Sequence, residues 1–511
     1  MTVIRMLGKM FANLSCRYLM RPLKDPVKTQ EAVLSKIIRI NRNTQFGKVH
    51  KFHHITSIPK FQELVLPHNY EYFRPYIDSM TKGESDILVP GKIPHWGITA
   101  GSTGNPKLIP ITSRGIGFAL RGLLRLYFSY IAENPREHSK FLDGTVCFFT
   151  ANPAVRYINN TPVGFGTGVF SESSQRQIWS PFVRKFFYSP RYMFKIKDLQ
   201  QRFQQLTREI TQKDIRAFVG VTSVVLGFLE IIFKNAQAKN PSLQFLKEIF
   251  PNYQLSVLGG ENSKFYEQRF FSLIGHKIDI REIYGATEEL IGVQLQESPG
   301  FTPCCDSCFL EFIPIKSTER LLINEVKEST PYRVIITNYN GLYAYTIGDV
   351  IEFISTDPPL FTFSHREGTV NIGSGNMTIQ QISNALTQTN AEHHCRIVEY
   401  CVIGKYNPKP QFIFVIEFDA SRYPVNETEY LNALHRNLMV YNPSYRQLIE
   451  ELRNMTEPLL WIVKTGTFSE LEQHNLKGGT PMGQQKIQHL STEEKLLRQF
   501  TPYLIKEVNL D

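Results

Sequence analysis

The sequence predicts an α/β fold followed by a second, self-contained segment near the C-terminus, and three observations lead to this prediction. The chain has 511 residues, of which 42% are hydrophobic and 20% charged, a composition typical of a folded protein and not of a disordered or fibrous one. Helical and strand-like patterns alternate along it, as in sheets with crossover helices. After FTFSHREG, residues 361–368, a passage rich in Gly, Asn and Ser precedes another helix-and-strand pattern.

The individual elements follow from caps and β-forming residues. Each expected helix opens on a residue type that suits an N-cap, and the expected strands are short and rich in β-formers. We expect helices over Thr29–Ile40, Asp198–Gln212, Thr222–Ala238 and Thr492–Phe500, and strands over Thr145–Thr150, Gln254–Leu258, Arg333–Asn338 and Gln411–Phe418.

Charge and cysteine content narrow the class of protein. Lys and Arg exceed Asp and Glu, 57 against 47, for a formal net charge of +10. The basic residues are scattered, which suits an anionic small molecule or surface, and we expect no nucleic-acid partner. Seven cysteines without regular spacing argue against a secreted disulfide framework and favour a reducing compartment, the cytoplasm.

A cysteine cluster leaves a metal site as an alternative. Cys304, Cys305 and Cys308 lie close in sequence, and the His-His-Cys run at 393–395 could supply distant ligands. The CCxxC spacing is not that of a standard zinc knuckle and runs directly into the strand-like FLEFIPI, residues 309–315. We therefore favour structural cysteines over zinc.

The N-terminus carries no clear targeting signal. Arg5, Lys9 and Arg17 interrupt its apolar residues, whereas a secretory signal or a membrane span needs a continuous apolar run. We expect no stable membrane insertion; an amphipathic helix that touches a membrane surface stays open.

The segment GITAGSTGNPKLIPIT, residues 97–112, suits a clamp on a polyphosphate. Its glycines let backbone amides approach a ligand, its hydroxyls donate hydrogen bonds and its lysine supplies a point charge. The spacing of the nucleotide-triphosphatase loop is absent, and alone the segment could be an ordinary polar turn. The candidate ligands are Thr99, Ser102, Thr103 and Lys107.

Two downstream segments add to this interpretation. REIYGATEELIG, residues 281–292, follows the pair Gly259 and Gly260 by about twenty residues, and GLYAYTIGDVIEF spans residues 341–353. A carboxylate such as Asp349 can accept hydrogen bonds from a ribose diol, an exposed Tyr284 can stack on a purine, and Glu288 beside a hydroxyl can hold Mg²⁺. Taken alone, Asp349 could instead be a turn or cap residue, Glu288 a helix-surface residue and Tyr284 a core aromatic.

The three segments together resemble the adenylate-forming superfamily, with motifs like TSGSTGxPK, YGxTE and YRTGD. More narrowly, the chain resembles the bacterial branch of the Gretchen Hagen 3 family of acyl-acid amido synthetases. The resemblance runs from about Tyr70 to about Ser491, and its further motifs are HNYEYFRPYIDSMTKGESDILVPG, KLIPIT, TPVGFGTG, FLEFIPI, GLYAYTIGD and GQQKIQHLS.

The resemblance implies a large N-terminal adenylate-forming domain with β-sheets and flanking helices, residues 1–366, and a smaller mobile α+β domain, residues 367–511. It implies that an ATP-dependent, AMP-forming ligase couples a carboxylic acid to AMP with Mg²⁺ and then passes the acyl group to an amino acid amine. Transfer to coenzyme A or another thiol, and nucleotide binding without catalysis, are the alternatives. The sequence predicts neither the acid nor the oligomeric state; residues 161–168 and 220–230 are candidates for the acid pocket.

Residue by residue, the resemblance implies these roles. Thr99, Ser102, Thr103 and Lys107 hold phosphates, and Glu288 coordinates Mg²⁺. Tyr284 flanks adenine near the backbone of Gly259 and Gly260, Thr287 touches the α-phosphate, Tyr345 lines the nucleotide site and Asp349 binds the ribose. Arg366 precedes a hinge expected over residues 366–375, and Lys486 approaches the site from the small domain.

The chain departs from the family pattern at four positions. Ala344 and Thr346 stand where arginines are frequent, and Asn376 and Met377 stand where bacterial relatives usually have an acidic residue and often a lysine. We expect these changes to remove charges near the nucleotide or the hinge and to leave the main ATP contacts intact.

Overall fold

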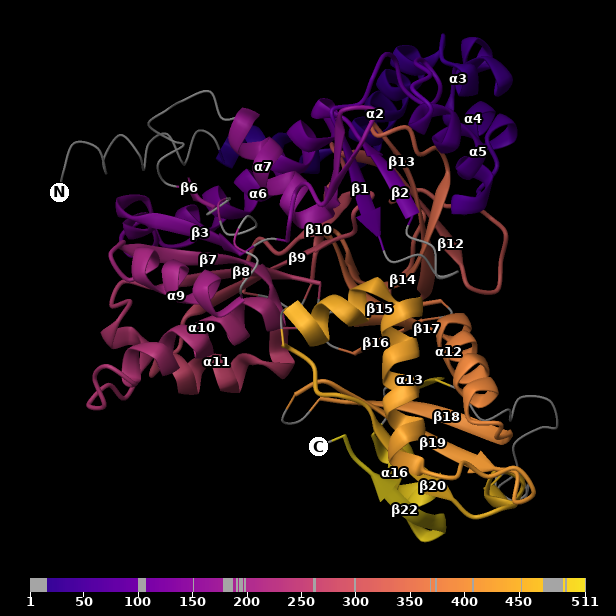
Figure 1. Ribbon diagram of the computed structural model, residues 1–511. Coiled ribbons are helices and arrows are strands. Elements are labelled where there is room, and N and C mark those ends of the chain that lie inside the picture. The colour runs from indigo at the N-terminus through magenta and orange to yellow at the C-terminus, as the bar shows by residue number, and fades with distance from the viewer. Residues whose placement is uncertain are drawn as a thin grey trace. The chain divides into compact units, whose positions relative to one another are not determined.

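The computed structural model describes residues 16–99, 107–149, 151–177, 187–189, 192, 196, 199–260, 263–297, 300–367, 369–372, 375–406, 409–451, 453–471, 490–491 and 494–510. These residues form two compact units, the first ending at Ser364 and the second beginning at His365. Figure 1 shows mixed sheets with flanking helices in both, so the predicted α/β class is confirmed. The predicted boundary after residue 366 and the mobility of the smaller domain stay predictions.

A seven-stranded sheet forms one part of the first unit. Five neighbouring strands, from β9 to β6, run parallel, and at the other edge β10 pairs antiparallel with both β9 and β11. The strand order is β11 (Thr302–Pro303), β10 (Leu290–Val293), β9 (Asp279–Gly285), β8 (Leu255–Gly259), β7 (Ile215–Val221), β3 (Thr145–Phe149) and β6 (Phe187–Tyr188).

Helices cover both faces of this sheet, because alternate strand residues point to opposite sides. Val146 and Phe148 pack in the cluster that contains α6 (Ser113–Glu133), whereas Cys147 and Phe149 pack with the helices of the other face. That second face is covered by α9 (Leu199–Ile210), α10 (Thr222–Gln237) and α11 (Glu267–Ile274), which lie together below the sheet in Figure 1.

Two four-stranded sheets complete the first unit. One has the order β2 (Lys107–Ile111), β1 (His95–Thr99), β5 (Thr161–Phe165) and β4 (Arg156–Ile158), and β5 leads directly into α7 (Gly166–Gln177). The other has the order β12 (Cys308–Pro314), β13 (Pro331–Asn338), β14 (Tyr345–Thr356) and β15 (Pro359–Arg366).

Four N-terminal helices share one apolar core with strands of these two sheets. Phe46, Phe61 and Phe73 are almost completely buried in it, beside Trp96 of β1 and Tyr343, which precedes β14. The helices are α2 (Pro26–Asn41), α3 (Gln45–Val49), α4 (Ile58–Leu64) and α5 (Tyr70–Thr81). The entry to α5 thereby comes close to β2 and β14.

The second unit contains a five-stranded sheet with an apolar cluster on each face. Its order is β21 (Leu490–Ser491), β18 (Ile397–Lys405), β19 (Gln411–Phe418), β20 (Leu459–Val463) and β22 (Leu504–Val508). The helices are α12 (Ile379–Glu392), α13 (Glu427–Tyr441), α14 (Pro443–Arg446) and α16 (Lys495–Phe500), and a hairpin of β16 (Thr369–Ile372) and β17 (Gly375–Thr378) precedes them.

Most of the predicted elements are confirmed, with differences at their starts. The first helix begins at Pro26 and not at Thr29, because Asp25 accepts a hydrogen bond from the Lys28 amide as N-cap and Pro suits the first turn. Thr222 opens α10 without capping it. The last predicted helix begins at Lys495, later than the predicted Thr492.

The cysteine cluster lies in a buried part of the first unit. Cys304, Cys305 and Cys308 are fully buried as free thiols. In the described part of the chain, no group of three or more His, Cys, Asp or Glu side chains is arranged to hold a metal ion. Among these same residues, every helix is too short or too polar to cross a bilayer.

A buried ion pair holds the cysteine segment against α6. Arg125 is 0% exposed, and its Nη2 donates to Asp306 Oδ1 at 2.8 Å, while its Nε donates to the Leu19 carbonyl oxygen at 2.8 Å. Removing one member of such a pair leaves the other charge uncompensated in an apolar environment.

We therefore expect Asp306→Ala to lower the free energy of unfolding of the first unit by about 3–5 kcal/mol. Glu63→Ala, which breaks the exposed Lys60–Glu63 pair at 2.7 Å, should cost less than about 1 kcal/mol. Denaturant unfolding monitored by circular dichroism measures both values. Equal stability of the two variants would contradict the structural role assigned to Arg125.

Candidate active site

The predicted phosphate clamp begins and ends on a pair of antiparallel strands. Thr99, the last residue of β1, lies opposite Lys107, the first residue of β2. Ser102 and Thr103 lie outside the described residues. The backbone therefore brings one predicted hydroxyl and the predicted lysine to the same end of this strand pair.

Thr287 packs against this strand pair at very short range. A Cβ atom added to Gly97 of β1 would lie 2.4 Å from Thr287 Cγ2, and one added to Gly166 would lie 2.7 Å from Thr287 Oγ1. A side chain at either position would therefore force Thr287 or the neighbouring backbone to shift. Because side chains alternate along a strand, Thr99 shares the face of β1 on which Gly97 meets Thr287. The first and second predicted motifs are thus brought together.

Glu288, the next residue of the same turn, is held by neutral donors. Its side chain is 6% exposed, and Oε1 accepts a hydrogen bond from the Tyr345 hydroxyl at 3.3 Å. Within the described ranges no Lys or Arg forms an ion pair with this carboxylate. A buried carboxylate without a protein cation fits Mg²⁺, which commonly binds one or two carboxylates together with substrate phosphates.

Two asparagines that the sequence analysis missed support this turn. The side-chain amides of Asn338 and Asn340 donate to the Glu288 carbonyl oxygen at 2.9 and 3.2 Å. Asn340 Oδ1 also accepts from the Thr112 amide at 2.9 Å, just after β2. The sequence signal is the run TNYNG before GLYAYTIGD, which is typical of a turn built on asparagine and glycine.

Tyr284 and Asp349, predicted to contact adenine and ribose, contact each other. The Tyr284 hydroxyl donates to Asp349 Oδ2 at 2.7 Å. The expectation of an exposed tyrosine is wrong: Tyr284 is only 8% exposed, because its ring packs among Phe301, Phe361 and Phe363 with centroids 5.4–5.8 Å away. The hydroxyl fixes the carboxylate, so Asp349 has one defined orientation.

The predicted glycine pair lies beside the strand that carries Tyr284. Gly259 ends β8 opposite Ile283 of β9, and a Cβ atom added to Gly259 would lie 2.8 Å from Ile283 Cγ1. Gly260 adopts φ +80°, a conformation that side chains rarely take. The backbone at this point therefore lies one residue from Tyr284 across the sheet.

The remaining predicted residues belong to the second unit or lie outside the described residues. Arg366 is the last residue of β15 and falls in the second unit. Lys486 and Gly368 lie outside the described residues. The expected hinge passage, residues 366–375, includes β16 and the first residue of β17, and these two strands pair as a hairpin; its role as a hinge stays a prediction.

The departures at Met377 and Ala344 have a packing explanation. Met377 is 0% exposed in the core of the second unit, and its sulfur accepts from Asn442 Nδ2 at 3.4 Å. An ionised side chain at position 377 would be buried in this core. The expectation that the change removes a charge near the nucleotide or the hinge stays a prediction. Ala344 is also fully buried, with φ +44°. Thr346 is half-buried in β14.

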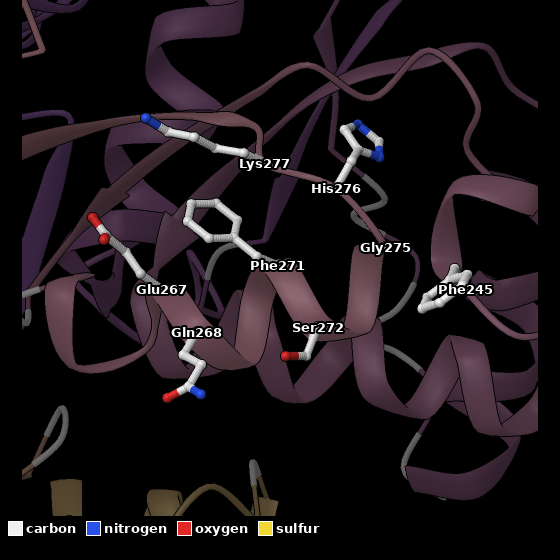
Figure 2. Close-up of a pocket in the computed structure, with 8 residues that line it drawn as sticks. All are labelled: Phe245, Glu267, Gln268, Phe271, Ser272, Gly275, His276 and Lys277. Carbon is white, nitrogen blue, oxygen red and sulfur yellow. The ribbon is translucent and has the colours of Figure 1, made fainter.

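Figure 2 shows a shallow surface pocket of the first unit around α11 and the turn that follows it. It is lined by Phe245, Glu267, Gln268, Phe271, Ser272, Gly275, His276 and Lys277. None of the predicted site residues lines it, and Lys277 is paired with Glu297 at 2.7 Å. We therefore assign the candidate site to the motif residues and not to this pocket.

A second glutamate in the YGATEE turn is buried without a partner for one oxygen. Glu289 is 4% exposed; Oε1 accepts from the Leu290 amide at 3.2 Å, and Oε2 has no hydrogen-bond partner among the described residues. Burial, reinforced by the nearby Asp306 carboxylate, raises the pKa of Glu289 well above its ordinary value of 4.5. This side chain is therefore neutral in the fold over a range in which it ionises in the unfolded chain.

Glu289→Gln should make stability less dependent on pH. A raised folded pKa gives stability that is fully present below the unfolded pKa, near 4.5, and is lost as the pH rises toward the folded pKa. The unfolding free energy of the variant relative to the unmodified protein should rise by up to about 1.4 kcal/mol per pH unit above that point. Denaturant titrations at several pH values measure it, with Glu63→Gln at the surface as control; parallel profiles would contradict the assignment.

Three models of known protein domains match parts of the chain. Residues 17–214 match the GH3 family N-terminal domain, residues 301–366 the GH3 family central domain and residues 380–495 the GH3 family C-terminal domain. Together these matches span most of the chain and include β1, β2, β14 and four of the five strands of the sheet in the second unit.

The relatives are distant, and their coverage differs. A probable indole-3-acetic acid-amido synthetase GH3.1 of Arabidopsis thaliana is 24% identical over 40% of this chain and 37% of its own length. A jasmonoyl–L-amino acid synthetase JAR4 of Nicotiana attenuata is 20% identical over 91% of both chains. The chain thus spans less than two fifths of the first of these relatives.

Comparison of the fold covers a longer stretch of the chain. The structure of AtGH3.15 acyl acid amido synthetase in complex with 2,4-DB covers 96% of both chains, with a TM-score of 0.61 and 17% identity. Such identity shows a shared fold. With the three domain matches in sequence order and this fold, the resemblance noted in the sequence is confirmed, and the chain belongs to the GH3 family.

Proposed function

We propose that this chain is an ATP-dependent, AMP-forming ligase that adenylates a carboxylic acid and transfers the acyl group to the amine of an amino acid. The observation that carries the proposal is the close approach of Thr287 to the glycine backbones of β1 and α7. This approach joins the phosphate-clamp strands to the turn that contains Glu288, and Tyr345 reaches the same turn. The names of the GH3 relatives support the reaction class.

The proposed nucleotide site uses the residues already described. Thr99 and Lys107, with Ser102 and Thr103, hold phosphates, and Thr287 touches the α-phosphate. Tyr284 and the backbone of Gly259 and Gly260 flank adenine, Tyr345 lines the site, and Asp349 accepts hydrogen bonds from the ribose hydroxyls. Glu288 holds Mg²⁺, which when bound offsets negative charge on the phosphate oxygens.

The chemistry follows from positioning and charge. A carboxylate is a poor electrophile at neutral pH, and joining it to AMP gives the acyl carbon a good leaving group. Lys107 stabilises charge on the phosphates while the acid's oxygen attacks the α-phosphorus and pyrophosphate leaves. The amine, once unprotonated, attacks the acyl carbon and AMP leaves.

The proposal also covers the small domain, the location of the protein in the cell and the acid pocket. We propose that residues 367–511 move relative to the large domain, that Arg366 borders the hinge, and that Lys486 approaches the acyl-adenylate site, as in the family to which the chain belongs. We also propose a cytoplasmic location, which the seven free cysteines support. Thr161–Gly168 is a candidate wall of the acid pocket, because Gly166 meets Thr287.

Exchange of labelled pyrophosphate into ATP tests the proposal directly. A panel of carboxylic acids is offered with Mg²⁺, and exchange that depends on one acid identifies both the reaction and its first substrate. Glu288→Gln should lower the affinity for Mg²⁺ and so raise the Mg²⁺ concentration that exchange requires. Binding of ATP without exchange for any acid would instead support the alternative of a non-catalytic nucleotide-binding protein.

Asp349→Ala should weaken ATP binding by about 1.5–3 kcal/mol, the scale for hydrogen bonds to a charged acceptor. Isothermal titration calorimetry measures the change. Asp214→Ala, which removes a carboxylate paired with Arg216 at the surface, is the matched control and should leave ATP affinity unchanged. Unaltered affinity in the Asp349 variant would show that the ribose assignment is wrong.

The acyl acceptor should be an amino acid and not coenzyme A. An amine needs only a small carboxylate-recognising pocket, whereas coenzyme A needs a channel and basic contacts for its nucleotide. Enzyme preloaded with acyl-adenylate is offered amino acids and coenzyme A separately, and products are followed by mass spectrometry. A dominant thioester, with no amide from any standard amino acid, would favour the coenzyme A alternative.

A further inference from the structure

Tyr70, the first residue of α5, makes an unusual pair of contacts with β2. Its hydroxyl accepts a hydrogen bond from the Leu108 amide at 3.0 Å and donates to the Leu108 carbonyl oxygen at 3.3 Å. One side-chain oxygen thus satisfies both polar groups of a single backbone residue. Tyr70 is 4% exposed, so this contact is largely shielded from water.

The contact occurs at the open edge of a sheet. β2 is the edge strand of the order β2-β1-β5-β4, and Leu108 lies opposite Ile98 of β1. Edge residues present backbone groups that no neighbouring strand satisfies. The Tyr70 hydroxyl takes the place of that strand at the residue directly after Lys107.

The Tyr70 ring also contacts the lysine itself. Lys107 Nζ lies 5.5 Å from the ring centroid, within the range of a cation–π interaction. Asn69 caps α5 by accepting from the Glu71 amide at 3.1 Å, which fixes the start of the helix and hence the ring. The hydroxyl therefore fixes the backbone at Leu108 while the ring limits the positions of the neighbouring ammonium group.

Two residues earlier, His68 holds the strand that carries Tyr345. The His68 amide donates to the Ala344 carbonyl oxygen at 3.0 Å, and the Thr346 amide donates to the His68 carbonyl oxygen at 2.9 Å. The His68 ring stacks on Tyr72 of α5 with centroids 3.7 Å apart. Residues 68–70 therefore span the interval between the start of β2 and the start of β14.

We infer that Tyr70 is a positioning residue for Lys107. It fixes the position of the phosphate-binding ammonium group relative to Tyr345 and Glu288. The inference rests on the proposed function, because it assigns Tyr70 to the nucleotide site of that reaction. Tyr70 itself is not placed against substrate; it acts through the backbone of Leu108 and through the Lys107 side chain.

Tyr70→Phe tests the inference, because it keeps the ring and removes the hydroxyl. The matched control is Tyr130→Phe: the Tyr130 hydroxyl also donates one hydrogen bond, to Asp279 Oδ2 at 3.1 Å, and accepts one, from Gln254 Nε2 at 3.1 Å, but at the amino ends of the parallel strands. Both variants should lose similar thermal stability. Only Tyr70→Phe should raise the KM for ATP in pyrophosphate exchange, by about fivefold to tenfold.

A double variant separates positioning from general destabilisation. In the Lys107→Ala background, Tyr70→Phe should have no further effect on the KM for ATP, because it acts through the lysine. Hydrogen exchange adds a readout that does not depend on activity: the Leu108 amide should exchange faster in Tyr70→Phe than in the unmodified protein.

The outcomes are distinct. In an active enzyme, three results would each overturn the inference. The first is hydrogen exchange of the Leu108 amide in Tyr70→Phe at the same rate as in the unmodified protein, and the second is the same KM for ATP in Tyr70→Phe and Tyr130→Phe. The third result is additive effects of Tyr70→Phe and Lys107→Ala on that KM. If the unmodified protein exchanges no pyrophosphate with any acid, the proposed function itself fails, and the inference fails with it.

Discussion

The candidate site depends on one steric constraint, the approach of Thr287 to two backbones that have no Cβ atom. Gly97 lies on β1 and Gly166 begins α7, and a methyl group at either position would overlap Thr287. Such overlap forces the backbone or its neighbours to move, because packed interiors have few voids. The parallel pairing of β1 with β5 sets Gly97 opposite Gly164, two residues before Gly166. Everything else in the site is arranged around the turn that this contact fixes.

Neutral hydrogen-bond donors then hold the turn. Asn338 and Asn340 bind the Glu288 carbonyl, and the hydroxyls of Tyr345 and Tyr284 reach the carboxylates of Glu288 and Asp349. A neutral donor orients a carboxylate without cancelling its charge. The buried Glu288 carboxylate thus retains its attraction for a cation, and the Asp349 carboxylate has an oxygen that the Tyr284 hydroxyl orients.

The sequence predicted the fold class, most elements and the motifs of the site, because local patterns carry this information. It did not predict the hydrogen bonds from Asn338 and Asn340 to the Glu288 carbonyl oxygen, because these asparagines look like ordinary turn residues until the fold brings Glu288 beside them. Burial of Tyr284 was also missed: its three phenylalanine neighbours come from residues 301–363, so no local pattern indicates them. Asp25 was missed as the cap because the prediction took Thr29, another residue type that suits an N-cap, as the start of a helix that begins at Pro26.

Departures from a family motif have to be weighed by where the side chain lies. Met377 fills the apolar core of the second unit beside Asn442, and a charged residue in that place would need a hydrogen-bonded or charged partner. Methionine is flexible and fills irregular space, so this substitution is a matter of packing. Ala344 differs, because its left-handed backbone is held by the Thr337 hydroxyl and by His68. This position sets the path of the backbone into Tyr345. The hydrogen bonds that hold this path go to backbone atoms of Ala344, so they do not require an arginine side chain.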